Sequence, residues 1–255
     1  MNILLTLCYH GGQYHGFQVQ PNDVTVCAVL QNALEKVLGA RPDIKGCSRT
    51  DAGVHALDYK ANFRFETSLP DEKIPLALNS CLPPDIRVLR AQRVPEDFHA
   101  RYDALAKSYR YVWLNSRIDD PFAPGQYYRV TGPMDEAAMH NAAQVLAGRH
   151  DFAAFMSAGG SITDTVRTVT AISVTREGQR VLLDITADGY LYNMVRIIAG
   201  TLLQVGRGAR TAEETAAALA SRSRESAGET QPACGLFLRR VNYPPERLLP
   251  PGSPI

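Results

Sequence analysis

The chain has 255 residues, 45% of them hydrophobic and 21% charged, which is the composition of a folded globular protein and excludes a largely disordered one. Its formal net charge is only +1, so a surface that binds nucleic acid must be a local concentration of Lys and Arg and not a global excess. No apolar run approaches the roughly 20 residues of a membrane span, and the first residues do not resemble a signal peptide.

The cysteines give no sign of a disulfide framework or a zinc site, because their number is odd and no CxxC pair occurs. They are Cys8, Cys27, Cys47, Cys81 and Cys234. We expect reduced, mostly buried thiols in a cytoplasmic protein. The absence of GxxxxGK[ST], HExxH and GxSxG, and of GxGxxG after a strand, argues against the common nucleotide-binding, metalloprotease and serine-hydrolase classes.

The first part of the chain predicts alternating strands and helices. Apolar residues recur at helical spacing from Val26 to Leu38, and Gly39 is a natural end for that helix. In chain order we expect a strand at 3–9, a helix at 24–38, a strand leading into 47–51, a strand at 59–65, a helix at 73–81 and a strand at 86–94.

The second part repeats this mixture without repeating the sequence. We expect strands at 108–114, 166–175, 180–187 and 235–241, and helices at 135–147, 194–205 and 211–220. Two units of similar plan follow from this pattern, so the predicted fold class is α+β. We place an N-terminal unit at 1–104, a C-terminal unit at 105–243, and a proline-rich tail without regular structure at 244–255.

The densest group of charged and hydroxyl residues runs from Cys47 to Ala56 at a strand-to-loop junction. Arg49 precedes Asp51 by two residues, which suits an arginine that orients a carboxylate or contacts a phosphate. The same pattern fits a turn in which Asp51 caps the next segment and Arg49 is solvated. His55 is a candidate general base, although a polar loop histidine is more often structural.

Three further clusters contain candidate functional residues. Glycines and aromatics from Tyr9 to Gln18, including Tyr14, suit close approach to a nucleic acid, or an ordinary loop with anchoring aromatics. Tyr109 and Tyr111 share one face of a strand, where tyrosines are usually core. Arg196 lies in an apolar helix, and because a buried arginine is costly without an acid, we nominate Asp51 as its partner.

Together these segments resemble the tRNA pseudouridine synthase A family. SRTDAGVHA at 48–56 is similar to the catalytic motif of that family. The other matching segments are YHGGQYHGFQVQ near the start, DFHARYDALAKSYRYVWLN from Asp97, GYLYNMVRIIAGTLLQVGRG from Gly189 and CGLFLRRVNY from Cys234. They agree in order and spacing, and the resemblance covers roughly residues 1 to 245.

The resemblance implies an isomerase that converts uridine to pseudouridine in the anticodon stem-loop of tRNA. It implies two ferredoxin-like α+β lobes with a mostly antiparallel sheet and a central active-site cleft. It also implies a cytoplasmic homodimer that binds tRNA, with no metal, no cofactor and no membrane association.

The resemblance also assigns roles to individual residues. Asp51 would be the nucleophile, Tyr109 would pack on the target base, and Arg196 would pair with Asp51. The expected substrate-binding residues are Tyr109, Arg49, His55, Tyr14 and Gln18. The cations expected to contact tRNA phosphates are Arg49, Arg101, Lys107, Arg207 and Arg210.

Three positions depart from the family pattern: His10 where Asp is common, Phe17 where Trp is usual, and Cys27 where Gln is common. They bear on RNA contacts and not on the reaction. Attack at the base ring, attack at C1′ and elimination to a glycal all remain open. Two alternative functions are a non-catalytic RNA-binding protein of the same fold and an aspartate-nucleophile hydrolase.

Overall fold

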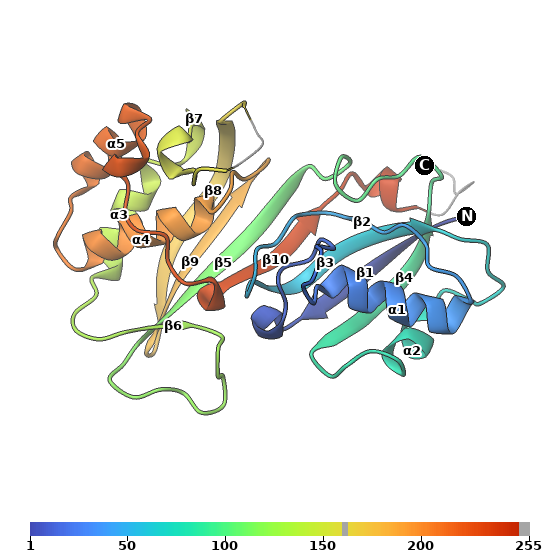
Figure 1. Cartoon of the computed structure of the whole chain (residues 1–255). Helices are drawn as coiled ribbons and strands as arrows, with labels where there is room; N and C mark the ends of the chain where they lie inside the picture. The colour runs from blue at the N-terminus through green and yellow to red at the C-terminus, as the bar shows by residue number, and fades with distance from the viewer. Residues whose placement is uncertain (160–162, 250–255) are drawn as a thin grey trace. The chain divides into compact units, whose positions relative to one another are not determined.

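The computed structural model describes residues 1–159 and 163–249 and divides the chain into two compact units (Figure 1). One unit combines Met1–Leu105 with the returning segment from Leu238, and the other is Ala106–Phe237. Each unit mixes helices with a mostly antiparallel sheet, so the α+β class expected from the sequence pattern is confirmed.

The first unit is built on a sheet in the order β4-β1-β3-β10. Its strands are β1 (Asn2–Tyr9), β3 (His55–Arg64), β4 (Ile86–Val94) and β10 (Leu236–Asn242), the last of which begins in the second unit. The β1 strand pairs antiparallel with both β3 and β4, and the short β2 (Lys45–Gly46) pairs with β3. Two helices lie against this sheet in Figure 1, α1 (Val26–Leu38) and α2 (Ile74–Asn79).

Helix α1 forms where the periodicity predicts it. The Thr25 side chain accepts a hydrogen bond from Ala28 N at 3.3 Å, which caps the first turn. Leu30 and Leu34 are fully buried on its inner face. The helix ends at Gly39, whose φ of 72° is left-handed and therefore favours glycine.

The second unit has the sheet order β5-β9-β8-β7, with neighbouring strands antiparallel, and β6 pairs parallel with β5. Its strands are β5 (Ala106–Asn115), β6 (Tyr128–Val130), β7 (Gly148–Asp151), β8 (Val166–Glu177) and β9 (Arg180–Ala187). Three helices gather on one side of the sheet in Figure 1, α3 (Glu136–Gln144), α4 (Met194–Gly206) and α5 (Ala212–Ser221). Helix α4 is buried at every position except Arg196 and Gln204.

Some segments differ from the sequence pattern. The strand expected to lead into 47–51 is only the two-residue β2. Beyond it, Cys47 N still donates to Lys60 O of β3 at 2.8 Å, and Thr50 O accepts from Phe17 N at 3.2 Å. Strands β6 and β7 were not expected; they are short, and their pairing comes from neighbouring strands and not from local alternation. In the tail, Pro245–Leu248 forms a 3-10 helix, and residues 250–255 lie outside the described residues.

No helix in the described part of the chain is both long and apolar enough to span a bilayer.

Helix α4 packs directly on the backbone of the segment that precedes β10. The Gly228 N–H donates to Thr201 Oγ1 at 2.8 Å, and Gln231 N donates to Arg196 O at 3.1 Å. A Cβ at Gly200 would lie closer to Glu229 O than the 3.0 Å below which real Cβ contacts essentially do not occur. The absence of a side chain at Gly200 therefore sets how closely this segment approaches α4.

We predict that Gly200→Ala lowers the free energy of unfolding by about 1–3 kcal/mol. The new methyl group would clash with backbone atoms, which cannot relieve the clash by changing a rotamer. Gly206→Ala in the same helix is the matched control. There the nearest atom is Sδ of the flexible Met139 side chain at 2.6 Å, so the loss should be smaller. Urea unfolding measures the free energy of unfolding of both variants. Equal decreases would contradict a close approach of the segment's backbone to Gly200.

Candidate active site

Asp51 lies in a loop between β2 and β3 whose backbone is held by the Gly-rich segment after β1. Gly53 N donates to Tyr14 O at 3.1 Å, and Phe17 N donates to Thr50 O at 3.2 Å. Within the loop, Val54 N donates to Asp51 O at 3.2 Å, which closes a tight turn with Gly53 at φ 78°. The Asp51 side chain is half-buried, so its carboxylate is positioned without being sealed from solvent.

The glycines at 11 and 16 permit this contact between the two segments. A Cβ at Gly16 would lie within 3.0 Å of Thr50 O, and one at Gly11 would lie within 3.0 Å of Val54 O. Gly16 also has φ 80°, which L side chains rarely adopt. Sequence reasoning offered these glycines as a place for nucleic acid to approach; in the structure both lie against the Asp51 loop.

Side chains reinforce the same contact. The hydroxyls of Tyr9 and Thr50 share a hydrogen bond of 2.8 Å, and Gly11 N donates to His55 Nδ1 at 3.0 Å. Because a backbone N–H can only donate, Nδ1 is unprotonated and is already used as an acceptor. His55 is buried, with its ring centroid 4.4 Å from that of His10. This environment favours the structural role for His55 that the sequence pattern left open.

Tyr14 and Gln18 occupy different environments. The Tyr14 ring is buried, and its hydroxyl donates to Asp85 Oδ1 at 2.7 Å; burial, followed by this hydrogen bond, raises the pKa of Tyr14. Gln18 is exposed and lines a pocket of about 500 Å³ together with Arg49. The contacts of these residues with RNA stay predictions, but Gln18 and Arg49 are the two that solvent reaches freely.

In the second unit, Tyr109 and Tyr111 lie on the same face of β5, as the alternation predicts. Tyr109 packs edge-on against Tyr190 with ring centroids 4.8 Å apart. Tyr111 donates to Pro232 O at 2.8 Å. On the opposite face, Arg110 pairs with Asp184 at 2.7 Å. The Tyr109 ring is therefore rigidly held with 7% of its surface exposed.

The Arg196 guanidinium is oriented by two neighbours that sequence reasoning missed. Its Nε donates to Gln231 O at 2.6 Å, and its Nη1 donates to Asn193 Oδ1 at 2.8 Å. Asn193 has φ 61° at the start of α4, and its Nδ2 donates to Ser157 Oγ at 3.0 Å. Asparagine is among the few non-glycine residues that tolerate this conformation. An asparagine directly before an apolar helix was therefore the sequence feature that could have indicated this role.

The residues assigned by the resemblance thus fall on both units. Asp51, Arg49, His55, Tyr14 and Gln18 belong to the first unit, and Tyr109 and Arg196 belong to the second. The pairing of Asp51 with Arg196 stays a prediction.

Metal-binding groups do not stand out in the part of the chain that the structure describes. No cluster of three or more His, Cys, Asp or Glu side chains is placed to hold a metal ion among these residues. All five cysteines lie within the described ranges and are thiols.

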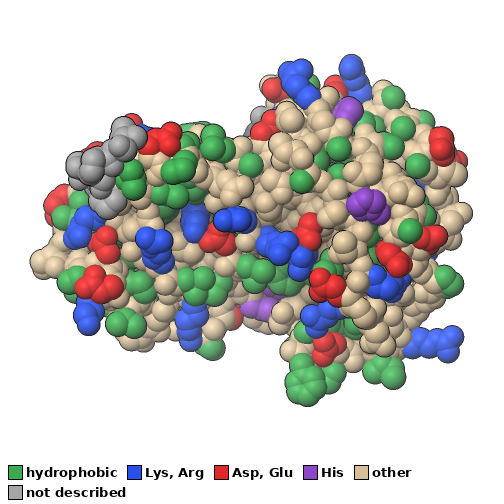
Figure 2. Space-filling view, turned by 180° about the vertical axis from the view of Figure 1, so that it is seen from behind, with side chains coloured by type: hydrophobic (Ala, Val, Ile, Leu, Met, Phe, Trp, Pro, Cys, Tyr) green, Lys and Arg blue, Asp and Glu red, His purple; other side chains and the backbone are tan. Residues whose placement is uncertain are grey.

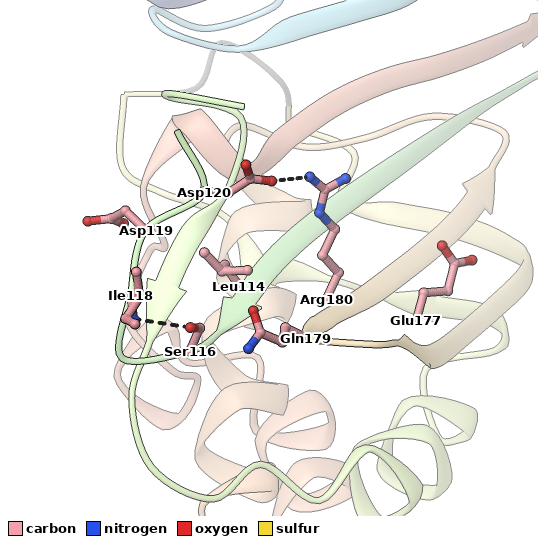
Figure 3. A pocket seen from close by; sticks show the side chains of 8 residues that line it. All are labelled: Leu114, Ser116, Ile118, Asp119, Asp120, Glu177, Gln179 and Arg180. Carbon is pink, nitrogen blue, oxygen red and sulfur yellow. Dashed lines mark hydrogen bonds and ion pairs between the residues drawn. The ribbon is translucent and has the colours of Figure 1, made fainter. Parts of the chain in front are cut away.

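A second pocket, of about 640 Å³, lies in the second unit and has acidic walls (Figure 3). Asp119, Asp120 and Glu177 line it, and Arg180 donates to Asp120 at 2.7 Å. A hydrogen bond from Phe122 N, followed by that of Arg180, lowers the pKa of Asp120, so its carboxylate is ionised. Walls of this charge do not suit a phosphate, and none of the predicted catalytic residues lies there.

Surface charge elsewhere is mixed. On the face drawn in Figure 2, Lys and Arg side chains are interspersed with Asp and Glu, in line with the net charge of +1. Positive charge for binding a polyanion must therefore come from local groups, of which Arg49 beside Asp51 is one.

We predict that Gly16→Ala lowers kcat by about tenfold or more, because the added Cβ displaces the peptide carrying Asp51. Gly39→Ala is the matched control, with a similar φ of 72° but no atom within 4 Å of the new Cβ. Both variants bear the cost of a left-handed alanine, on the order of 1 kcal/mol, while only the first meets the Asp51 loop. Steady-state kinetics measures the loss of activity, and urea unfolding measures the loss of stability. Equal loss of activity in both variants would contradict a role of Gly16 in positioning Asp51.

Comparison with known proteins gives consistent matches. A family model described as tRNA pseudouridine synthase matches residues 8–103 and 142–244. The chain is 44% identical over 242 residues to tRNA pseudouridine synthase A of Thermoanaerobacter sp. (strain X514), covering 95% of this chain and 99% of that protein. It is 46% identical over 239 residues to tRNA pseudouridine synthase A of Halalkalibacterium halodurans, covering 93% and 91%.

Among solved structures, the crystal structure of a Cbf5-Nop10-Gar1 complex aligns with a TM-score of 0.36 at 11% identity. That alignment covers 92% of this chain and 57% of the other, and it is too weak to support an argument.

Proposed function

Since this chain belongs to the tRNA pseudouridine synthase family, and is therefore an isomerase that converts uridine to pseudouridine in tRNA, we propose that the Asp51 carboxylate is its nucleophile. The observation that carries the proposal is the Asp51 loop. Its backbone is held at Thr50 and Gly53 by the segment around Tyr14 and Phe17, while the Asp51 side chain stays half-exposed. A fixed, accessible carboxylate is what covalent catalysis requires.

The target uridine must first leave its helix, because a stacked base cannot meet a side chain. Extruding it costs a few kcal/mol. Arg49 is exposed two residues before Asp51, so it is placed to contact the RNA backbone beside the displaced base and to hold the open state. We therefore assign Arg49 to RNA binding and base flipping.

Asp51 then acts as the covalent catalyst. The C1′–N1 bond breaks, the uracil turns within the site, and C1′ joins C5. C5 loses a proton and N1 gains one, so the composition of the nucleoside is unchanged. The carboxylate attacks the base ring or C1′, or promotes elimination to a glycal. All three routes need an ionised Asp51 and a surface on which the freed uracil turns.

We assign that surface to Tyr109 and the countercharge to Arg196. The Tyr109 ring is held against Tyr190, so it offers a rigid wall for the base, and its hydroxyl is a candidate acceptor for the C5 proton. The Arg196 guanidinium is oriented by Asn193 and Gln231, and an ion pair with Asp51 favours the carboxylate form.

The remaining features that the resemblance implies belong to the same proposal. They are two ferredoxin-like lobes around a central cleft, a homodimer, a cytoplasmic location, and a target in the anticodon stem-loop.

We expect Asp51→Asn to lower kcat by about a thousandfold or more, because the amide keeps the shape of the side chain but is not a nucleophile. Affinity for tRNA should stay within about threefold of wild type. Pseudouridine mapping in treated tRNA measures turnover, and filter binding measures affinity. Glu72→Gln, at an exposed acid of the same unit, is the control. Appreciable turnover by a sequence-verified Asp51→Asn protein would remove Asp51 from this role.

We expect Arg196→Met to reduce turnover and to move the acid limb of the pH–rate profile to higher pH, because protonation of Asp51 becomes easier without the guanidinium. Arg149→Met, at an exposed position in β7 of the same unit, is the control. When Asp51→Asn is already present, Arg196→Met should reduce turnover only slightly further, because the two residues act together. An unmoved acid limb together with additive losses would show that Arg196 serves another group.

A further inference from the structure

The pocket beside Arg49 has a feature that the proposed chemistry does not use. It has a volume of about 500 Å³, within the range of about 300–1,000 Å³ typical of small-ligand sites. Its lining includes Arg49, His99, Arg101, Tyr102 and Lys45, all in the first unit. Asp51, two residues after Arg49, is not part of the lining. The pocket is therefore beside the reacting group and separate from it.

The charge of this pocket is positive and is not neutralised within the protein. Three cations line it, Lys45, Arg49 and Arg101, against one acid, Asp43. Only Lys45 pairs with Asp43; neither arginine forms an ion pair among the described residues.

Several arginines elsewhere in the chain do have carboxylate partners. Carboxylate partners are present for Arg93, Arg110, Arg176, Arg180 and Arg247. Two guanidiniums without carboxylates in one pocket favour an anionic ligand, for which guanidinium geometry suits a phosphate.

An aromatic ring stands at the same pocket. Tyr102 is 75% exposed, yet its ring centroid lies 4.3 Å from that of His99, and the Arg101 Cζ lies 5.8 Å from the ring centre. The exposed ring leaves apolar surface in contact with water, and stacking on a flat partner would bury that surface. The ring is thus held in place with most of its surface open.

The turn that carries this ring is fixed by hydrogen bonds. His99 Nδ1 accepts from Arg101 N at 3.1 Å, and His99 N donates to Asp103 Oδ2 at 3.1 Å. Arg247 in turn pairs with Asp103 at 2.7 Å. Burial, followed by the charge of Lys45, lowers the pKa of His99, so the imidazole is neutral at pH 7 and serves as a flat support for Tyr102.

We propose that this pocket binds one nucleotide of the RNA other than the reacting uridine, with its base stacked on Tyr102 and its phosphate on Arg101. A base with a free face occurs in single-stranded loops and not inside a duplex, so the nucleotide is an unpaired one. Stacking on an aromatic ring is tolerant of base identity, and the pocket therefore recognises an unpaired nucleotide near the target and not a sequence. This inference rests on the proposed function, because it takes tRNA as the ligand.

The direct test places 2-aminopurine at each loop position of an anticodon stem-loop RNA in turn. Its fluorescence is quenched when it stacks. With the wild-type chain we expect quenching on binding at one loop position outside the target. Tyr102→Ala should abolish that quenching and raise Kd about fivefold to a hundredfold, whereas Tyr102→Phe should keep both near wild type.

The phosphate contact is tested separately. Arg101→Gln should weaken binding several-fold at low salt and reduce the slope of log affinity against log salt by about one contact. Two matched controls lie outside the pocket: Arg90→Gln, at an exposed arginine of β4, and Phe122→Ala, at a 94% exposed aromatic of the second unit. Neither should change the quenching or the affinity.

Two results would overturn the inference. One is a Tyr102→Ala protein that binds and quenches like wild type, and the other is a Tyr102→Phe protein that loses as much as Tyr102→Ala. Isomerisation of whole tRNA by the wild-type chain is assayed in parallel, because it tests the proposed function alone. Quenching that depends on Tyr102 in a chain that does not isomerise tRNA would reject the proposed function and support the subsite.

Discussion

The carbonyl oxygens of Thr50 and Val54 lie so close to the chain at Gly16 and Gly11 that no side chain fits between them. This steric constraint limits where the peptides on either side of Asp51 can lie. The hydrogen bonds from Phe17 and to Tyr14 then complete a contact that is made almost entirely by main chain. Backbone packing of this kind is stiff, and a stiff loop keeps a reacting carboxylate in one geometry.

The second unit applies the same principle to a different element. Helix α4 meets the backbone at residues 228–231 through Gly200, and this contact brings Gln231 O to the Arg196 guanidinium. Asn193 holds the other side of the guanidinium while occupying a left-handed conformation. A charge on an otherwise buried helix is thus oriented by one main-chain oxygen and one amide. In each unit, close backbone approach therefore fixes the surroundings of a residue to which we assign a catalytic role.

The regular elements could be predicted from periodicity, and some of them to the residue. The limits of β4 and β9 match the expected strands, and α1 ends at the expected glycine. Strands β6 and β7 could not be predicted, because three or four residues carry no measurable alternation. The strand expected to lead into 47–51 is the two-residue β2, after which Thr50 O accepts a hydrogen bond from Phe17 N of a distant segment.

For the site, the motif singled out Asp51 and Arg49, but it did not distinguish residues that contact RNA from residues that hold the loop in place. His55 and Tyr14 were expected to contact RNA, and their hydrogen bonds to Gly11 and Asp85 were not visible in the sequence. The roles of Asn193 and Gln231 depend on tertiary contacts and on one left-handed residue, which no local pattern encodes.

The discontinuity of the first unit has a consequence for how the chain matures on the ribosome. Residues 1–105 need the segment from Leu238 to complete their sheet: Leu105 N donates to Asn242 O at 2.9 Å, and Val241 N to Asp58 Oδ2 at 3.4 Å. Synthesis runs from the N-terminus, so the whole second unit emerges before these bonds can form. The unit that carries Asp51 is begun first and completed only after the second unit, and the nascent chain leaves β3 without its β10 partner until residues 236–242 emerge.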